Sequence, residues 1–548
     1  MNKTIITAVL SLGLLTLAAQ AQKTEGPEMA STRQSARPAS VVAALPRAPL
    51  TLGRAGLSEQ RASNTLLPGV ILTTIRRGRL EAVKPWSVNL SAVATPAAAE
   101  KLLADLKSAG FEGRLDPMQV QGVVSEPLGY MVRVGHFAAR AQADIVQAAL
   151  KIKGFSGGVQ DILEDGAPST GPWVIQVLSV RPNAQAIVKA AIATDVLPGR
   201  ETTSALARRL GAVAAVNGGF FVVNDAGGTE GDLAGLSVQA GQLLSEAVNG
   251  RPALFIDSAS LRGAVVQGVT STISLNADGQ THTITGLNRK PGILQNCGNP
   301  VATPTTAPVH DYACRSANEL IRFTAAFGPT SDAGDGYEVS VDAAGTVTAT
   351  QPKRGSSIPA NGYTLQGIGT DATWLGQLKV GSRLGVTTSL NDAQGQAVNL
   401  TPTTYAVNGG PTLLIGGKAV NNYAAEGWSP KGLGGDDVAE KDAASSGDAR
   451  LNFFNGWLLR RVPRTAVGIM PDGTLLFVTV DGRNPTHSIG ASIPEMTALM
   501  RDLGAVDAMN LDGGGSTATY ANGLLQGIPT DATGERPDGD AIVILPKP

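Results

Sequence analysis

The chain has little cysteine, few aromatic residues and almost no surplus charge. Its 548 residues contain 2 cysteines, 4% are aromatic, and the net charge is −1. A net charge this close to zero argues against a nucleic-acid partner or an acidic membrane surface. Glycine is abundant, with 66 residues, and hydrophobic residues reach 43%. This composition predicts an ordered protein with many turns and enough length for several domains.

The N-terminus predicts export. Lys3 provides a positive start, Ile5–Ala18 is apolar but short for a membrane span, and small residues end the run at Ala19–Ala21. We therefore expect a signal peptide at residues 1–21 and a mature protein that is periplasmic, bound to the cell envelope or secreted. No cysteine stands directly after the expected cleavage site, which argues against a lipid anchor, and no later stretch is long enough to span a membrane.

Cys297 and Cys314 are the two cysteines of the chain. In an oxidising compartment they are expected to form a disulfide with each other, and two buried free thiols are the alternative. Two cysteines and a single nearby His310 fall short of a tetrahedral zinc site.

Residues 22–84 mix Ala, Ser, Pro, Arg and Gly with little periodicity, and we interpret them as a flexible linker with one short strand at Gly69–Ile75. Residues 85–165 alternate between strand and helix patterns in the order βαββαβ. The segments at Pro85–Leu90 and Tyr130–Phe137 resemble the SPOR domain. The resemblance implies a ferredoxin-like module that binds peptidoglycan glycan strands, and a generic packing module of the same topology is the alternative.

Residues 171–548 form the large domain in this interpretation. Trp173–Val180 predicts a strand, Asn183–Thr194 a helix and Ser492–Leu503 a helix with Pro494 in its first turn, whereas most other segments are short strands. We therefore expect an α+β protein with a β-rich mixed domain.

Three predicted strands end in an asparagine close to paired glycines. These are Asn217 before Gly218 and Gly219, Asn408 before Gly409 and Gly410, and Asn510, which two residues separate from Gly513 and Gly514. One such end is a common turn, but three suggest that the asparagines converge on one ligand. Independent Asn-Gly turns are the alternative.

The third strand end also carries Asp512, followed by Gly513, Gly514, Gly515, Ser516 and Thr517. Glycine backbone N–H groups and two hydroxyls can bind an anion, and Asp512 lies where an acid, base or nucleophile is needed. Arg464, followed by Thr465, is a candidate phosphate clamp because guanidinium binds phosphate in a fork. A surface arginine and a tight glycine turn are the alternatives.

Seven segments together resemble the phosphodiester glycosidase family, in the order that the family has: Ala215–Phe221, Gly286–Arg289, Asn408–Gly410, Pro463–Gly468, Asp481–Arg483, Asn510–Ser516 and Gly534–Arg536. The resemblance implies an exported hydrolase that removes a sugar from a sugar-1-phosphodiester, such as an α-N-acetylglucosamine-1-phosphate ester. It adds Arg483 and Arg536 to the expected substrate-binding residues.

Phosphate leaves easily once its charge is stabilised, so the site should consist mainly of anion-binding groups. We expect Asp512 to act as base or nucleophile, Asp481 as the second carboxylate, and Asn510 with Asn217 and Asn408 to orient sugar hydroxyls. No cofactor is expected, although a carboxylate-rich glycine loop can also hold a divalent cation such as calcium. A metal-dependent phosphodiesterase and a non-catalytic envelope-binding protein remain as alternatives.

Overall fold

The computed structural model describes residues 45–80, 84–118, 129–248, 250–296, 310, 313–421, 423–428, 451 and 454–548. The expected signal peptide and Cys297 lie outside these ranges, so the cleavage site and the disulfide remain predictions. Contacts group Ala44–Pro548 into one compact unit. Within the ranges just given, no helix is both long and apolar enough to cross a membrane.

An eight-stranded antiparallel sheet forms the centre of the large domain. Its strands in spatial order are β1 (Glu59–Leu67), β2 (Val70–Arg77), β7 (Trp173–Val180), β29 (Leu475–Val480), β28 (Arg464–Ile469), β30 (Asp507–Asn510), β26 (Thr412–Ile415) and β27 (Lys418–Ala419). Every residue of β7, β28 and β29 is buried, as expected for central strands that are covered on both faces.

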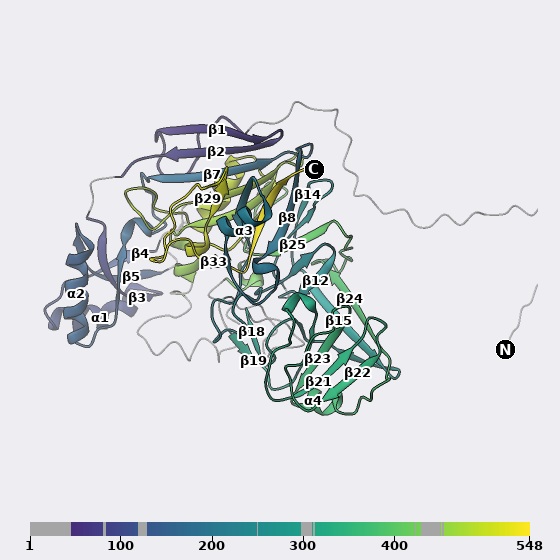
Figure 1. Cartoon of the computed structure of the whole chain (residues 1–548). Coiled ribbons are helices and arrows are strands. Elements are labelled where there is room, and N and C mark those ends of the chain that lie inside the picture. The colour runs from purple at the N-terminus through teal and green to yellow at the C-terminus, as the bar shows by residue number, and fades with distance from the viewer. Residues whose placement is uncertain are drawn as a thin grey trace, which may run out of the picture. The chain divides into compact units, whose positions relative to one another are not determined.

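The flexible linker predicted over residues 22–84 is corrected at residues 59–77, where the hairpin β1–β2 stands. Strand β2 pairs with β7 over its whole length, from Val70 opposite Val180 to Arg77 opposite Trp173, and the first four strands lie side by side in Figure 1. Strand β2 agrees with the short strand predicted at Gly69–Ile75. Sequence patterning missed β1, because β1 is mostly exposed and polar and no sustained apolar alternation marks it. The large domain is therefore discontinuous, and residues 84–165 are inserted between two of its paired strands.

Two further five-stranded sheets pack against one face of the central sheet. One contains β32 (Leu524–Leu525), β31 (Thr519–Ala521), β10 (Ala214–Asn217), β34 (Asp540–Pro546) and β8 (Ala186–Ile192); the other contains β12 (Gln242–Ser245), β11 (Ser237–Gln239), β25 (Thr404–Asn408), β13 (Ala253–Asp257) and β14 (Arg262–Val266). A single core cluster joins all three sheets and includes Leu178, Val216, Leu254, Val467 and Ile542. The helix expected at Asn183–Thr194 is instead strand β8, which pairs with β34 over seven residue pairs.

Helix α7 (Ile493–Asp502) covers the opposite face of the central sheet. Ser492 Oγ accepts a hydrogen bond from Glu495 N, the Glu495 carboxylate accepts one from Ser492 N, and a proline stands in the first turn. Met496, Leu499 and Met500 pack with Leu476 and other residues of the sheet. A smaller helix, α3 (Thr203–Leu210), ends at Gly211 with φ +69° and packs beside β10.

The inserted module has the order βαββαβ that the sequence predicts. Its sheet order is β4 (Gly113–Pro117), β5 (Tyr130–Phe137), β3 (Trp86–Val93) and β6 (Gly158–Asp161), all antiparallel, and its helices are α1 (Pro96–Ser108) and α2 (Arg140–Ile152). Leu106 and Leu150 of these helices pack on Val88 and Val132 of the sheet.

The outer part of the large domain is made of two small sheets and a short ladder. The first sheet contains β15 (Thr270–Ala277), β16 (Gln280–Thr283) and β24 (Leu384–Asn391). The second contains β17 (Gly286–Leu287), β20 (Glu319–Phe323), β21 (Tyr337–Val341), β22 (Val347–Gln351) and β23 (Tyr363–Ile368), and helix α4 (Thr370–Leu375) contacts it. The ladder pairs β18 (Ile293–Gln295) with β19 (Ala313–Arg315). The described part of the chain is therefore β-rich with few helices, which agrees with the expected α+β class.

Candidate active site

The three asparagine-ended strands belong to three different sheets and meet at one place. Strand β30 is part of the central sheet, β10 of the sheet with β34, and β25 of the sheet with β13. A cavity of about 510 Å³ opens beside their ends. Its wall is formed by Phe220, Phe221, Val223, Gln295, Asn296, His310, Gly456, Trp457, Val462, Arg464, Arg483, Asn510, Asp512, Gly513, Gly514, Gly515 and Arg536.

Asp512 lies in this wall, and the chain around it is firmly held. Its backbone N–H donates to Gly218 O at 3.2 Å, and its carbonyl accepts from Asn217 Nδ2 at 2.9 Å. The Thr465 hydroxyl donates to Asn217 Oδ1 at 2.6 Å, so Asn217 links strand β28 to the Asp512 loop. Asn217 is fully buried and does not line the cavity. The structure thus places Asn217 and Thr465 as supports of Asp512, whereas the sequence predicted contacts with substrate.

Asn408 supports the opposite wall in the same way. Its side chain accepts from Phe220 N at 2.8 Å and donates to Phe220 O at 3.2 Å, which fixes the residue whose ring enters the cavity. A Cβ at Gly219 would lie 2.6 Å from Asn408 O, so only glycine allows this close approach. Of the three predicted asparagines, Asn510 alone lines the cavity. Its amide donates to Gly410 O at 3.0 Å, and its Oδ1 has no hydrogen-bond partner within the described ranges.

Two of the three glycine N–H groups predicted to bind an anion already have hydrogen-bond acceptors within the protein. Gly513 N donates to Asp512 Oδ1 and Gly514 N to Pro463 O, each at 2.8 Å. Among the described hydrogen bonds none uses Gly515 N, so one of the three expected anion-binding N–H groups is available. Four other predicted substrate-binding residues do not line the cavity: Ser516, Thr517, Gly218 and Gly409.

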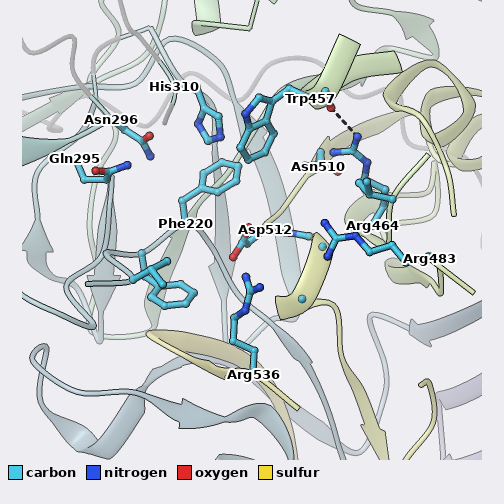
Figure 2. A pocket seen from close by; sticks show the side chains of 17 residues that line it. Phe220, Gln295, Asn296, His310, Trp457, Arg464, Arg483, Asn510, Asp512 and Arg536 are labelled. Carbon is cyan, nitrogen blue, oxygen red and sulfur yellow. Dashed lines mark hydrogen bonds between the residues drawn. The ribbon is translucent and has the colours of Figure 1, made fainter. Parts of the chain in front are cut away.

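Three arginines line the cavity: Arg464, Arg483 and Arg536. In Figure 2, Arg483 and Arg536 extend toward Asp512, whereas the guanidinium of Arg464 points toward the carbonyl of Trp457. Arg536 is paired with Asp531, with Nε 2.7 Å from Oδ2. Arg464 donates to the carbonyls of Ala491 and Trp457, and within the described ranges no carboxylate lies within ion-pairing distance of it. Burial, and then the positive charge of Arg483, lower the pKa of Arg464 to about 9, and burial also lowers the pKa of Arg483. Both arginines carry positive charge at neutral pH, and such charge stabilises a bound anion.

The other half of the cavity wall carries aromatic and amide side chains. Of these residues, only Phe220 and Phe221 belong to a motif that the sequence analysis identified. In Figure 2, Phe220, His310 and Trp457 lie together on the side away from Arg483. The His310 ring is 4.6 Å from Phe220 and 4.1 Å from Trp457. The pKa of His310 is well below its usual range because of burial and then the charge of Arg251, so the ring is neutral. Arg251 Nη1 can only donate to His310 Nδ1, at 2.8 Å, which places the histidine proton on Nε2.

Asp481 does not line the cavity. His487 Nε2 is 2.7 Å from Asp481 Oδ2, and Ile528 N donates weakly to the same oxygen. Two other carboxyls lie near Asp512 instead. Burial, and then the charge of Asp512, raise the pKa of Asp538 well above its usual range, and burial raises the pKa of Asp540 to about 7. Sequence reasoning missed both, because neither stands in a recognisable motif. Among the described side chains, no group of three or more His, Cys, Asp or Glu residues could hold a metal ion.

Comparison with known proteins bears on both domains. A family model described as phosphodiester glycosidase matches residues 335–545, and a SPOR domain model matches residues 82–160. A solved structure from Burkholderia pseudomallei, described as that of an exported protein, is 36% identical with a TM-score of 0.82, and the match covers 92% of this chain and 100% of that one. The chain belongs to the phosphodiester glycosidase family. The matched family region contains Arg464, Arg483, Asp512 and Arg536, but not Phe220.

More distant relatives match shorter stretches. The mouse N-acetylglucosamine-1-phosphodiester alpha-N-acetylglucosaminidase is 41% identical over 68 residues, or 12% of this chain and 13% of that protein. An uncharacterized prophage-derived protein of Bacillus subtilis is 35% identical over 121 residues, or 21% and 17%. The match thus spans less than a fifth of the length of either relative. A hypothetical protein from Synechocystis, 17% identical with a TM-score of 0.51 over 90% of this chain and 81% of its own, shares the fold.

Proposed function

We propose that this protein hydrolyses the bond between the anomeric carbon of a sugar and the phosphate of a sugar-1-phosphodiester. The observation that carries the proposal is the division of one cavity into two halves around Asp512. Arg464, Arg483 and Arg536 provide positive charge on one side, and Phe220, Trp457 and the neutral His310 provide an apolar wall on the other. A sugar ring fits the aromatic half, and a phosphate fits the cationic half.

The charges change during this reaction in a way that the cavity suits. A phosphodiester carries one negative charge, and the phosphomonoester that departs carries a second one as the C–O electron pair moves onto oxygen. Asp512 accepts the proton of the water that attacks the anomeric carbon, or attacks that carbon itself. The arginines stabilise the charge that develops on the leaving phosphate, which is the larger part of the catalytic task. Asn510 Oδ1, buried in the wall and without a partner among the described residues, accepts a hydrogen bond from a sugar hydroxyl.

The test is incubation of the full-length protein with a panel of sugar-1-phosphodiesters, including methyl esters of α-N-acetylglucosamine-1-phosphate. Release of free reducing sugar together with a phosphomonoester supports the proposal. Release of sugar-1-phosphate, with activity that a chelator removes, identifies a metal-dependent phosphodiesterase instead. No turnover of any ester under any condition rejects the glycosidase and leaves an envelope-binding role.

We infer further that the protein is exported and acts on phosphodiester-linked sugars of cell-wall or surface glycopolymers. The SPOR match supports a module of ferredoxin-like arrangement that binds glycan strands through residues 85–165. The antiparallel order β4-β5-β3-β6, with both helices packed with the sheet, supports the same arrangement. Sedimentation of the full-length protein with purified peptidoglycan, and its loss when peptide-free glycan strands compete, tests this inference.

A further inference from the structure

A second hollow, of about 350 Å³, lies between the inserted module and the large domain. From the module it is lined by Asn89, Leu90, Ser91, Met131, Ser156, Gly157, Gly158 and Gln160, and from the large domain by Asn455, Gly456 and Arg460. We call it the module groove. Gly456 also lines the cavity that contains Asp512. The module groove and the catalytic cavity therefore adjoin at one residue.

The chemistry of the module groove favours a hydroxyl-rich ligand. Its polar lining consists of amide and hydroxyl side chains, which both donate and accept hydrogen bonds. No carboxylate is among the described residues that line it. Its one cation, Arg460, is already paired with Glu164, with Nε 2.6 Å from Oε2. The groove therefore offers hydrogen-bonding groups rather than free charge for recognition of its ligand.

The polar groups of the groove are held in place from behind. Asn89 Nδ2 donates to Gln160 Oε1 at 2.5 Å, and Arg133 Nε donates to Asn89 Oδ1 at 2.8 Å. Arg133 is in turn bonded to both oxygens of Asp165, at 2.7 and 2.8 Å. Side chains fixed in this way lose little conformational entropy when a ligand binds.

The large-domain side of the groove is tied to the module by a second arginine. Arg461 is 1% exposed; its Nη1 donates to Leu163 O at 3.0 Å, and its Nη2 donates to Ala167 O at 2.6 Å and to Glu495 Oε1 at 2.6 Å. This arginine therefore joins the end of the module to helix α7, next to the one-turn π-helix Asn455–Leu459 that carries both Gly456 and Trp457. The segment that separates groove from cavity is thus anchored to both domains.

We propose that the module groove, built jointly by the two domains, binds a glycan strand and directs it past Gly456 into the catalytic cavity. The proposal rests on the proposed function and narrows its substrate class. The phosphodiester-linked sugar that is removed is carried on the same glycan polymer that the groove holds, and a small soluble ester uses the cavity alone.

The structure offers a matched pair of glycines for the test. A Cβ at Gly158 would have no atom within 4 Å, and Gly158 stands two residues before Gln160 on strand β6, so its side chain would project on the groove face. Gly158→Trp therefore fills the groove without displacing its wall. Gly385 lies on strand β24, remote from the groove, and a Cβ there would meet only Asn276 Cβ, at 4.0 Å. Gly385→Trp is therefore the control.

The first measurement is cosedimentation of the full-length protein with purified peptidoglycan stripped of its peptides, which needs no turnover. We expect Gly158→Trp to weaken binding roughly tenfold or more, equivalent to about 1.4 kcal/mol, and Gly385→Trp to bind as the unaltered protein does. Unchanged binding by Gly158→Trp overturns the proposal. If Gly158→Trp unfolds, Asn89→Ala and Ser91→Ala replace it, and retention of full binding by both also overturns the proposal.

The second measurement tests the passage between groove and cavity. Peptide-free glycan oligosaccharides of increasing length compete against hydrolysis of a small sugar-1-phosphodiester. We expect long oligosaccharides to inhibit competitively, and inhibition to weaken in Gly158→Trp by the same factor as binding. If Gly158→Trp loses glycan binding but long oligosaccharides never inhibit hydrolysis of the small ester, the groove does not lead into the cavity and the proposed passage is overturned. Selective loss of glycan binding in a protein that hydrolyses no ester rejects the proposed activity but leaves the groove supported.

Discussion

Arg289 and Arg464 are both almost completely buried, at 3% and 2% exposure, but their surroundings differ. Arg289 lies between two carboxylates, with Nε 2.5 Å from Glu246 and Nη2 2.8 Å from Glu319. Burial alone would lower the pKa of Arg289, but attraction to Glu246 and Glu319 outweighs it and raises the pKa. Arg464 donates to carbonyl oxygens, and its pKa is lowered.

The contrast separates two uses of a buried charge. Arg289 joins the segment after β12 to the outer sheet, and its Nη1 also donates to Ile293 O at 3.2 Å, just before the cavity residues Gln295 and Asn296. It is a structural clamp with its charge fully compensated. Arg464 keeps its charge uncompensated at the cavity wall, where a bound phosphate would supply the missing partner.

The largest expected effect is the loss of turnover when Asp512, in the same cavity wall as Arg464, is replaced. Asp512→Asn should lower turnover of a sugar-1-phosphodiester at least about 1,000-fold, because the amide can neither accept a proton nor attack carbon. Its urea midpoint should stay close to that of the unaltered protein. Asp278→Asn, in an exposed turn with φ +48°, is the matched control and should keep full turnover. Equal turnover by both variants would contradict the assignment.

Arg289→Met should destabilise the fold by about 3–5 kcal/mol, because Glu246 and Glu319 would remain buried without their cation. Urea unfolding measures the change. The fraction that stays folded should still turn over substrate. A free energy of unfolding within about 1 kcal/mol of the original value would show that the two glutamates do not need Arg289.

Arg464→Met should have the opposite profile. Loss of the uncompensated charge should lower turnover about 100-fold while the free energy of unfolding changes by about 1 kcal/mol, since lost carbonyl hydrogen bonds are offset by the removal of a buried charge. Arg322→Met, which removes an arginine that stacks on Tyr363 away from the cavity, is the control for turnover. Equal turnover in the two variants would remove Arg464 from the proposed phosphate half.

Burial shifts the pKa of Asp540 toward its neutral form, as it does for Arg464. Its folded pKa of about 7 lies above the value of about 4 expected in the unfolded chain, so the folded state binds more protons between these values. The contribution of Asp540 to stability is complete below about pH 4 and is lost as the pH rises to about 7. Asp540→Asn should therefore reduce the loss of stability between pH 5 and 8 by about 3 kcal/mol. Urea midpoints at the two pH values measure this, and parallel curves for variant and original would refute it.

Thr465→Val should have the smallest effect. The valine keeps the shape of the side chain but removes the hydrogen bond to Asn217 Oδ1, which holds the Asp512 loop from behind. We expect a loss of about 1 kcal/mol in stability and a several-fold decrease in kcat with little change in KM. A change in KM alone would show that Thr465 contacts substrate after all.

The sequence predicted the parts of this protein whose chemistry is local. Helix α7 was predictable because Ser492, Pro494 and Glu495 form its N-terminal cap. The loop at Asp512 was predictable because its three glycines are a poor sequence for a core, whereas the catalytic role of Asp512 stays a prediction. Strand β8 was mistaken for a helix because its alanines suit both structures, and pairing with β34 decides the outcome.

The aromatic half of the site could not be predicted in the same way. His310 and Trp457 are 147 positions apart in the sequence, and neither stands in a motif, yet their rings are 4.1 Å apart. The arginines, by contrast, lie in segments that resemble the family. Long-range packing without a local pattern therefore marks the limit of prediction here.

The hairpin β1–β2 also has a consequence for biosynthesis. Its hydrogen-bonding partner β7 leaves the ribosome only after the whole module, and β29, the next strand of the sheet, begins at Leu475. The strands of the module pair only with one another, so the module can fold before the rest of the chain is synthesised. The central sheet, by contrast, is completed only near the end of translation. A fragment that starts at Gly171 would leave the edge of β7 exposed, with a tendency to aggregate.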